Sequence, residues 1–227
     1  MKETNVFHQL VIVLSFLINA ALCGYIPPGP KYPCPENPSL FYPCKCTSGS
    51  DLGLEIYCGN SNLASLSIAF TNIAALRSPL EKLTIAAAKF SRLYGGLLYA
   101  LEVKRLYIED TPLKKIAPQT FLGVNRTLEE LHLVRTQLNE YPKDAFQNLG
   151  KLRILHIDGH TLTTLSVGSI AGLLPNNLER LSITNGNLTD LPVDTLVPLK
   201  KLKRLDLHGN NFKTLKRNQF KDFYIFS

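Results

Sequence analysis

The sequence lacks most of the signals by which an enzyme or an integral membrane protein is identified. It has no nucleophile motif, no phosphate-binding glycine loop and no cofactor fingerprint among its 227 residues. The adjacent Gly95 and Gly96 have no flanking strand pattern that would suit a nucleotide. Beyond the first two dozen residues, no segment is long and apolar enough to cross a bilayer. We therefore expect no catalytic residue, no cofactor and no transmembrane segment in this chain.

Cysteine is scarce and is confined to the first 58 residues. Residues 1–24 resemble a secretory signal peptide, with Lys2, an apolar run over residues 10–18 and small residues near the end. Cleavage there would remove Cys23 and leave an even set: Cys34, Cys44, Cys46 and Cys58. In an exported protein this set predicts two disulfides, with three pairings possible. The absence of Cys-x-x-Cys spacing argues against zinc, so we expect no metal ion.

What the sequence does contain is an apolar pattern that returns every 23 to 27 positions. The pattern is Leu-x-x-Leu-x-Leu-x-x-Asn-x-Leu, which is the leucine-rich repeat. Seven units fit it, starting at Gly53, Leu80, Val103, Leu128, Leu152, Leu178 and Leu202. The fourth and sixth positions are two apart, as in a strand with one buried face, and successive strands would form a parallel sheet. The repeat predicts an α/β solenoid, a right-handed horseshoe with this sheet on its concave face.

A second apolar register supports the first. Eight and eleven residues after the end of the pattern, six of the seven units carry apolar residues, as in Phe121 with Val124 and Phe146 with Leu149. An apolar pair three apart suits a short helical or 3₁₀ segment on the convex face. The ninth position, in contrast, keeps Asn only at Asn210. Because Asn there normally bonds neighbouring backbone, we expect a less regular arc in the early units, weakest at Ala88.

The third, fifth and seventh positions alternate with the buried ones and should form the concave surface. We expect an extracellular protein partner to bind there, because aromatic and arginine side chains are enriched at interfaces. The candidate binding residues are Arg105, Tyr107, Glu109, Glu130, His132, His156, Asp158, Arg180, Asp206 and His208. His132 and His156 should lie side by side, with Asp158 on the strand of His156. Metal binding or proton transfer by these three is the less favoured reading, since the site is open to water and lacks a further strong ligand.

Charge and glycosylation signals mark other surfaces. The formal charge is +7, and basic residues crowd the last unit, so an acidic glycan or an anionic surface is a possible partner there. A solvated, solubilising edge explains the same charges equally well. Export makes nucleic acid an unsuitable partner. Two sequons, at Asn125 and Asn187, predict glycosylation, with Asn125 the more accessible because Asn187 adjoins the buried Leu188.

Residues 178–220, with Leu-Thr-Asp-Leu-Pro from Leu188 and Leu-Asp-Leu-His-Gly-Asn-Asn-Phe from Leu205, resemble secreted arthropod leucine-rich repeat proteins. That group includes the non-catalytic subunit of Oplophorus-luciferin 2-monooxygenase, so the resemblance implies an accessory subunit of a secreted enzyme. The Cys-x-Cys at residues 44–46 resembles the N-terminal cap of extracellular members, which implies the pairs Cys34–Cys46 and Cys44–Cys58. The alternative is the ectodomain of a receptor or adhesion protein, resembling Toll-like or chaoptin-like proteins.

The expected organisation is therefore a signal peptide at 1–24, a proline-rich lead-in and disulfide cap at 25–58, and repeats over 53–227. The lead-in should be extended, with little structure of its own. A second cysteine cluster normally closes such an array, and its absence suggests a chain truncated at the C-terminus. The expected protein is a secreted, non-catalytic binding scaffold.

Overall fold

The computed structural model describes residues 28–165, 177–191, 196 and 199–220. The expected signal peptide, the expected convex residues Ile170, Leu173 and Phe223, and the rest of the last seven residues lie outside this part of the chain. The chain forms two compact parts, residues 1–30 and residues 31–227. The fold described below is that of residues 31–227. No helix in the described part is long and apolar enough to span a membrane.

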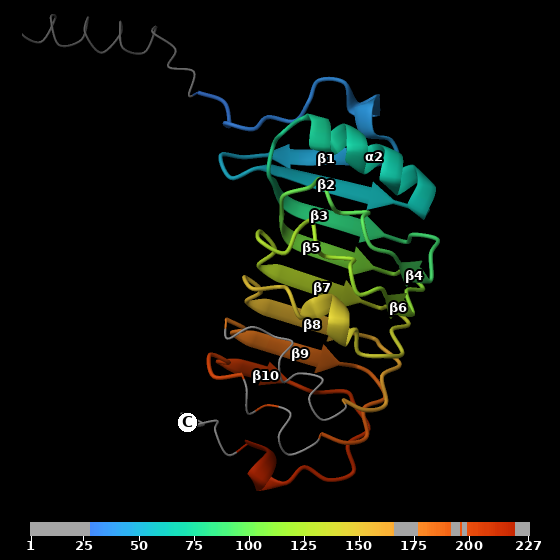
Figure 1. Ribbon diagram of the computed structural model, residues 1–227, viewed down its shortest axis with the longest axis vertical. Helices are drawn as coiled ribbons and strands as arrows, with labels where there is room; N and C mark the ends of the chain where they lie inside the picture. The colour runs from blue at the N-terminus through green and yellow to red at the C-terminus, as the bar shows by residue number, and fades with distance from the viewer. Residues whose placement is uncertain (1–27, 166–176, 192–195, 197–198, 221–227) are drawn as a thin grey trace, which may run out of the picture. The chain divides into compact units, whose positions relative to one another are not determined.

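An eight-stranded sheet runs the length of this unit and confirms the seven predicted repeats (Figure 1). Seven strands are parallel and follow one another in chain order, one from each unit. They are β2 (Leu54–Gly59), β3 (Leu80–Ala86), β5 (Val103–Glu109), β7 (Glu130–Val134), β8 (Ile154–Asp158), β9 (Arg180–Thr184) and β10 (Arg204–Asp206).

The fourth and sixth residues are buried in the first six units and partly buried in the last, at Leu205 and Leu207. Leu131 and Leu133 of β7 are fully buried, and Leu155 and Ile157 of β8 stack on them in register. The first and eleventh positions, such as Leu128 and Leu138, close the same core. Because no unit can bury these side chains alone, the core is continuous along the array. Its stability therefore depends on contacts between neighbouring units.

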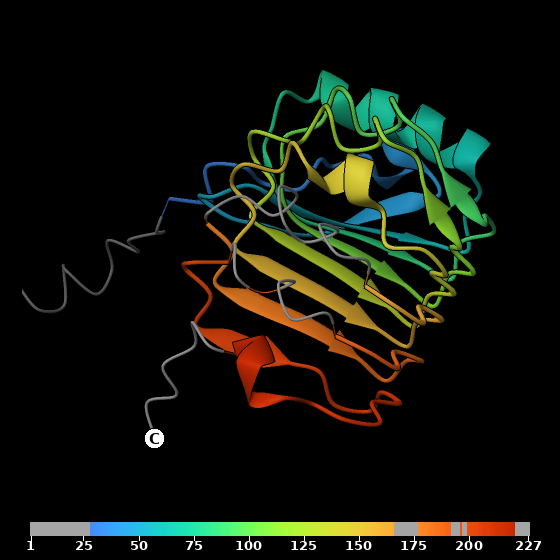
Figure 2. The same cartoon turned by 60° about the horizontal axis from the view of Figure 1, so that its bottom comes forward.

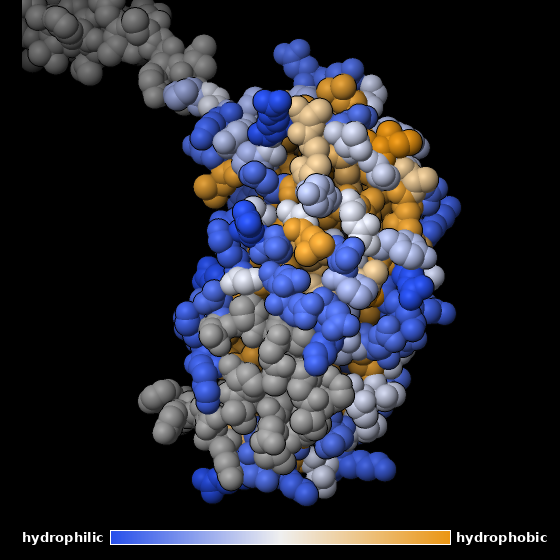
Figure 3. All heavy atoms as spheres, in the orientation of Figure 1, coloured by the Kyte–Doolittle hydropathy of each residue, from blue (hydrophilic) through white to orange (hydrophobic). Residues whose placement is uncertain are grey.

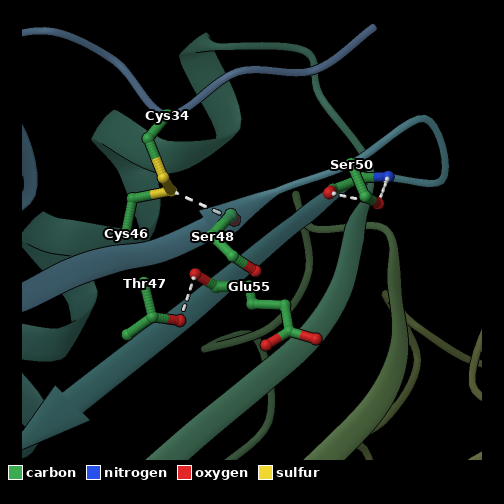
Figure 4. The surroundings of a disulfide bond; sticks show 7 residues. Cys34, Cys46, Thr47, Ser48, Ser50 and Glu55 are labelled. Atoms are coloured by element: carbon green, nitrogen blue, oxygen red, sulfur yellow. Dashed lines mark hydrogen bonds between the residues drawn. A yellow bond between two sulfur atoms is a disulfide. The ribbon is translucent and has the colours of Figure 1, made fainter. Parts of the chain in front are cut away.

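The cap at the start of the array is a hairpin that the repeat pattern does not predict. Strand β1 (Cys44–Gly49) pairs with β2 in antiparallel fashion, and Cys44 lies opposite Cys58. The disulfides are Cys34–Cys46 and Cys44–Cys58, as the resemblance implied. Figure 4 shows the first of them beside Thr47, whose hydroxyl donates to the backbone oxygen of Glu55 at 3.0 Å.

The lead-in is more structured than expected. Tyr32 forms a β-bridge with Ser50, and Cys34 is held by its disulfide. A 3₁₀ helix, η1 (Pro38–Phe41), begins after Asn37, whose side chain accepts from the backbone N–H of Ser39. Phe41 is buried and covers the apolar end of the first unit.

Short segments and one longer helix cover the face of the sheet opposite the predicted binding surface (Figures 1 and 2). The short elements are α3 (Lys143–Phe146), η2 (Arg217–Phe220) and a two-stranded sheet of β4 (Arg92–Leu93) and β6 (Lys115–Ile116). The expected convex pairs in the described units are buried, for example Phe121 with Val124. Figure 3 shows this face, where apolar side chains gather around the longer helix.

That longer helix, α2 (Leu63–Ala75), lies in the first unit and is absent from our sequence interpretation. Its Leu66, Phe70 and Ile73 are buried, while Ile68 on the opposite side is 64% exposed. Asn62 and Ser65 form a reciprocal capping box at its start. The helix therefore replaces the short convex segment of the later units and seals the first one.

The eighth residue of every unit adopts a left-handed conformation, which our sequence reading also missed. The seven φ angles lie between 49° and 67°, at Asn60, Ala87, Asp110, Arg135, Gly159, Asn185 and Gly209. In six units its N–H donates to the seventh residue of the next unit, as Arg135 does to Asp158 at 2.8 Å. This turn ends each strand and joins it to its neighbour. Asn, Asp and Gly, which tolerate this conformation, fill five of the positions.

The ninth position compensates for its missing asparagines in different ways. The expected weak point at Ala88 is not seen, because its N–H donates to the hydroxyl of Thr111 in the next unit at 3.2 Å. The side chain of Asn210 bonds four backbone groups of its own and the preceding unit, including the oxygen of Ile183 at 2.7 Å. At His160, Nδ1 accepts from the N–H of Leu162, and Gly186 leaves the space that the imidazole ring fills.

Candidate binding surface

The sheet register places the predicted binding residues in three columns on the concave face, the face opposite α2 and α3. Tyr107 lies beside His132, His132 beside His156, and His156 beside Ser182. The third-position column runs in the same order through Arg105, Glu130, Ile154, Arg180 and Arg204. The alternation of the strands therefore predicted correctly which of these side chains are neighbours.

A row of neighbouring rings crosses the middle of this face. The rings of Tyr107 and His132 are stacked, with centroids 4.2 Å apart, and the ring of His156 follows at 5.7 Å, tilted by 55°. The ammonium group of Lys82 lies 4.7 Å from the centroid of the Tyr107 ring, at the other end of the row. The row, which we call the aromatic row, comprises Lys82, Tyr107, His132 and His156.

Burial shifts the pKa of two side chains in this row. Burial, assisted by the charge of Glu130, raises the pKa of the Tyr107 phenol. Burial lowers the pKa of His132, although Glu130 Oε2, 3.5 Å from His132 Nε2, opposes the shift. His132 is therefore held neutral to lower pH than a free imidazole. A neutral, stacked imidazole is a rigid aromatic contact rather than a mobile charge.

The two histidines and Asp158 do not converge on a common point. His132 and His156 are neighbours, as predicted, but Asp158 Oδ1 accepts from Thr184 Oγ1 at 2.8 Å and from Asn185 Nδ2 at 2.7 Å. These two bonds lower the pKa of Asp158 although burial opposes them. The described residues contain no group of three or more His, Cys, Asp or Glu side chains that could hold a metal ion. Asp158 instead ties β8 to the end of β9.

The cations of the concave face differ in how they are neutralised. Arg105 Nη2 lies 2.7 Å from Glu81 Oε1 and 3.6 Å from Glu55 Oε1, so its charge is largely balanced within the protein. Arg180 and Arg204, neighbours on β9 and β10, are both exposed. Within the described part of the chain, neither guanidinium has a hydrogen-bond or ion-pair partner. The positive charge is therefore balanced near Arg105 but remains unpaired near Arg180 and Arg204.

A hollow of about 340 Å³ lies beneath these two arginines. It is lined by His132, Ile154, Leu155, His156, Arg180, Leu181, Ser182, Arg204 and Asp206. Asp206 is already engaged, because His208 Nδ1 lies 2.8 Å from its Oδ1 and the His208 N–H donates to the same oxygen. This contact with His208 lowers the pKa of Asp206. The hollow thus combines apolar walls with two unpaired guanidinium groups.

A ladder of charges of alternating sign, at the second position of successive units, borders the concave face. It reads Glu81, Lys104, Glu129, Arg153, Glu179 and Lys203. Arg153 bridges Glu129 at 3.9 Å and Glu179 at 3.0 Å, and Lys203 reaches Glu179 at 3.0 Å. These bonds lower the pKa of Glu179 to about 2. Exposed pairs of this kind are weak because water and salt screen them, but they favour the correct alignment of neighbouring units.

The two sequons differ from expectation in exposure. Asn125 is only half-exposed, whereas Asn187, next to the buried Leu188, is exposed. The side chain of Thr127 in the first sequon donates to the backbone oxygen of Val124. The alternation of buried and exposed residues turns Asn187 outward, which makes it the better glycosylation candidate of the two.

The fold and this surface define a leucine-rich repeat solenoid with an open, chemically varied sheet face. The sequence profile of the family described as "Leucine rich repeat" matches residues 102–162 and 176–223. These residues carry leucine-rich repeats, and the chain has the leucine-rich repeat fold. No curated protein matches its sequence.

Two solved structures show the same architecture. A chain in the octameric complex of Latrophilin 3, Unc5D and FLRT2, the last marked LRR, aligns with a TM-score of 0.55 and 20% identity over 68% of this chain. A chain in the TLR13–ssRNA13 complex aligns with a TM-score of 0.57 and 23% identity over 74%. The present chain spans 45% and 26% of those two chains. At these identities the likeness concerns the fold alone.

Proposed function

We propose that this protein is an extracellular, non-catalytic scaffold that binds a protein partner through the concave face. The observation that carries the proposal is the aromatic row, in which the half-buried rings of Tyr107 and His132 are stacked and that of His156 is in tilted contact. Rigid aromatic side chains bring contact area at little cost in conformational entropy. Flanking arginines add directional hydrogen bonding. A rigid array of strands holds all of these groups in place before a partner arrives.

An extracellular location is supported by the cysteines and by the first residues of the chain. Two disulfides in one small cap are typical of an oxidising compartment. Residues 1–24 would act as the signal peptide, which leaves the lead-in, the cap and the repeats as the secreted form. Glycosylation at the exposed Asn187 would fit the same compartment. A shift in mass after treatment with an amide-cleaving glycosidase would identify that glycan.

The concave face can be tested by substituting two of its anchors. Tyr107→Ala with Arg180→Ala removes one ring of the aromatic row and one unpaired guanidinium. Capture of the partner from extracellular fluid should fall by about tenfold or more, because anchor residues carry most of the binding free energy. Quantitative mass spectrometry of captured proteins measures the loss, and circular dichroism verifies that the variant is folded.

The control uses the same residue types on the other face. Tyr99 is 72% exposed and Arg126 is exposed, and both lie on the side of the sheet that carries α2 and α3. Tyr99→Ala with Arg126→Ala should leave capture unchanged. Equal capture by both folded double variants would exclude the concave face as the binding surface.

The identity of the captured protein distinguishes two more specific roles. The resemblance of residues 178–220 to secreted arthropod proteins supports an accessory subunit of a secreted enzyme, in which case a stoichiometric enzyme is captured. The likeness in fold to the chains from the FLRT2 and TLR13 complexes supports the alternative, a receptor or adhesion ectodomain. In that case peptides of the native protein continue beyond Ser227 into an apolar span of about 20 residues.

A further inference from the structure

Arg180 and Arg204 are side by side in register, an arrangement that is unfavourable without an anion. They occupy the same column of β9 and β10, whose strands are about 4.8 Å apart. Like charges directly opposite each other on a sheet destabilise it. Both guanidiniums point into solvent with no partner among the described residues, whereas Arg105 in the same column has two carboxylates. The pair therefore has unused capacity for hydrogen bonds to an anion.

The hollow below the pair favours a particular kind of anion. Its walls include the side chains of Ile154, Leu155 and Leu181, and Ser182 adds a hydroxyl. Ile154 is the only apolar residue in the third-position column between Lys82 and Arg204, and it lies directly beside Arg180. An apolar wall next to two guanidinium groups complements a carboxylate that has an apolar neighbour. A polysulfated glycan would gain nothing from that wall.

The remaining charges at the hollow do not oppose a carboxylate. Asp206 is the one acidic residue of its lining, and its Oδ1 is bonded to His208. Glu179, next to Arg180 in the chain, is occupied by Arg153 and Lys203 on the edge of the sheet. Glu179 is thus paired with other cations, and Asp206 is bonded to His208 although the charge of Arg204 also acts on it. Neither carboxylate forms a hydrogen bond or ion pair with Arg180 or Arg204 among the described residues.

We propose that Arg180 and Arg204 form a carboxylate-binding site for an extended acidic segment of the partner protein, with the apolar neighbour of that carboxylate seated against Ile154. The planar guanidinium groups would each donate two N–H bonds to a carboxylate. This proposal rests on the proposed function, since it names the chemistry of the partner segment that the concave face recognises.

The experiment uses the whole secreted chain and a defined probe. The probe is a short dye-labelled peptide with Glu-Leu-Glu in a Gly-Ser context, compared by fluorescence anisotropy with its Gln-Leu-Gln counterpart and with labelled heparin. The test variant is Arg180→Gln with Arg204→Gln. The matched control is Lys213→Gln with Lys216→Gln, which removes the same charge from exposed positions of the last unit outside the strands.

The Glu-Leu-Glu probe should bind saturably, and its affinity should fall by about tenfold or more in the arginine variant. The lysine control should bind within about twofold of the native protein, and affinity should decrease with added salt. Equal weakening in both variants would mean that general positive charge attracts the probe, and would overturn the site. Binding of heparin but not of the peptide, or no peptide binding at all, would overturn it as well.

The two proposals fail in distinguishable ways. If the partner is captured by the Arg180→Gln, Arg204→Gln variant as well as by the native protein, the carboxylate site is wrong. If Tyr107→Ala alone weakens that capture, the concave face remains the binding surface. If no concave variant weakens either capture of the partner or binding of the Glu-Leu-Glu probe, both proposals are wrong.

Discussion

At the scale of single residues, the eighth position shows how a backbone requirement can override the choice of side chain. All seven units are left-handed there, although Ala87 and Arg135 have a Cβ that disfavours this conformation. Arg135 is compensated by an ion pair with Asp110, including a bond of 2.7 Å between Nη2 and Oδ2. Ala87 is exposed and makes no such pair. The cost at Ala87 is therefore borne by contacts elsewhere in the array.

Replacement of Ala87 with glycine should stabilise the protein. A left-handed residue with a Cβ costs about 1–2 kcal/mol, and the extra freedom of glycine in the unfolded chain costs about 0.5–1 kcal/mol, so the net gain is about 0.5–1 kcal/mol. Urea denaturation monitored by circular dichroism measures this difference. The reverse change, Gly159→Ala, should destabilise, because φ is 65° and a Cβ would approach Arg135 Cα at 3.1 Å. Destabilisation by Ala87→Gly would contradict this account.

His132 should make stability depend on pH near neutrality. Its pKa in the folded protein is lowered by burial from the model-peptide value of 6.5, so below that pH the unfolded chain binds more protons. The stabilisation is complete above about pH 6.5 and is lost as the pH falls toward the lower, folded value. The pKa of His160 is also lowered by burial and contributes in the same direction.

The free energy of unfolding at about pH 7.5 and at about pH 5.5 tests this dependence. His132→Phe keeps a ring against Tyr107 but cannot be protonated, so the difference between the two pH values should shrink, with His160 supplying the remainder. Glu179 does not interfere, since its pKa is lowered to about 2 and its contribution is lost only below pH 4.5. An identical difference in variant and native protein would show that His132 is not responsible.

At the scale of elements, α2 differs from every other convex segment and carries its own stabilising contacts. Asn62 Oδ1 accepts from the N–H of Ser65 at 2.9 Å, and Asn72 Nδ2 donates to the backbone oxygen of Leu40 in η1 at 2.8 Å. The helix thus joins the cap to the first unit. Because each unit is stabilised by its neighbours, the capping box of this helix contributes to the stability of the whole array.

Loss of the capping box should be measurable in isolation. Asn62→Ala removes the acceptor at the start of α2 and should lower the free energy of unfolding by about 1 kcal/mol. Ser67→Ala, at an exposed position inside the same helix, should change it by less than about 0.5 kcal/mol. Thermal and urea denaturation of both variants provide the comparison. Similar losses in the two variants would place the effect in the helix interior rather than at its cap.

The elements also show which structural features the sequence could predict. The strands and their register were predictable because the same spacing occurs seven times, so chance matches at single units do not matter. The helix α2 was not predictable from the repeat. In the first unit, the two positions that are apolar on the convex side of later units are Thr71 and Ala74. A period of three and four through Leu66, Phe70 and Ile73, after Asn62, was the available signal. The hairpin of β1 and β2 occurs only once in the described part of the chain, so no repeated spacing predicts it.

The same limit applies to the binding surface. The neighbours on the concave face followed from alternation alone, including the His132–His156 pair. Asp158 lies on the strand of His156, as expected, but its hydrogen bonds to Thr184 and Asn185 did not follow from the alternation. Similarly, the unpaired state of Arg180 and Arg204 depends on where Glu179 and Asp206 place their carboxylates. These choices are made by local hydrogen bonds that a residue pattern does not encode.

At the scale of the whole molecule, the alternating ladder limits how such an array can grow in evolution. Copying one unit in place would set two glutamates, or two cations, next to each other at the border of the sheet. Each such contact would replace an attraction by a repulsion. Copying two adjacent units would preserve the alternation. We therefore expect the array to tolerate insertion or removal of repeats best in pairs.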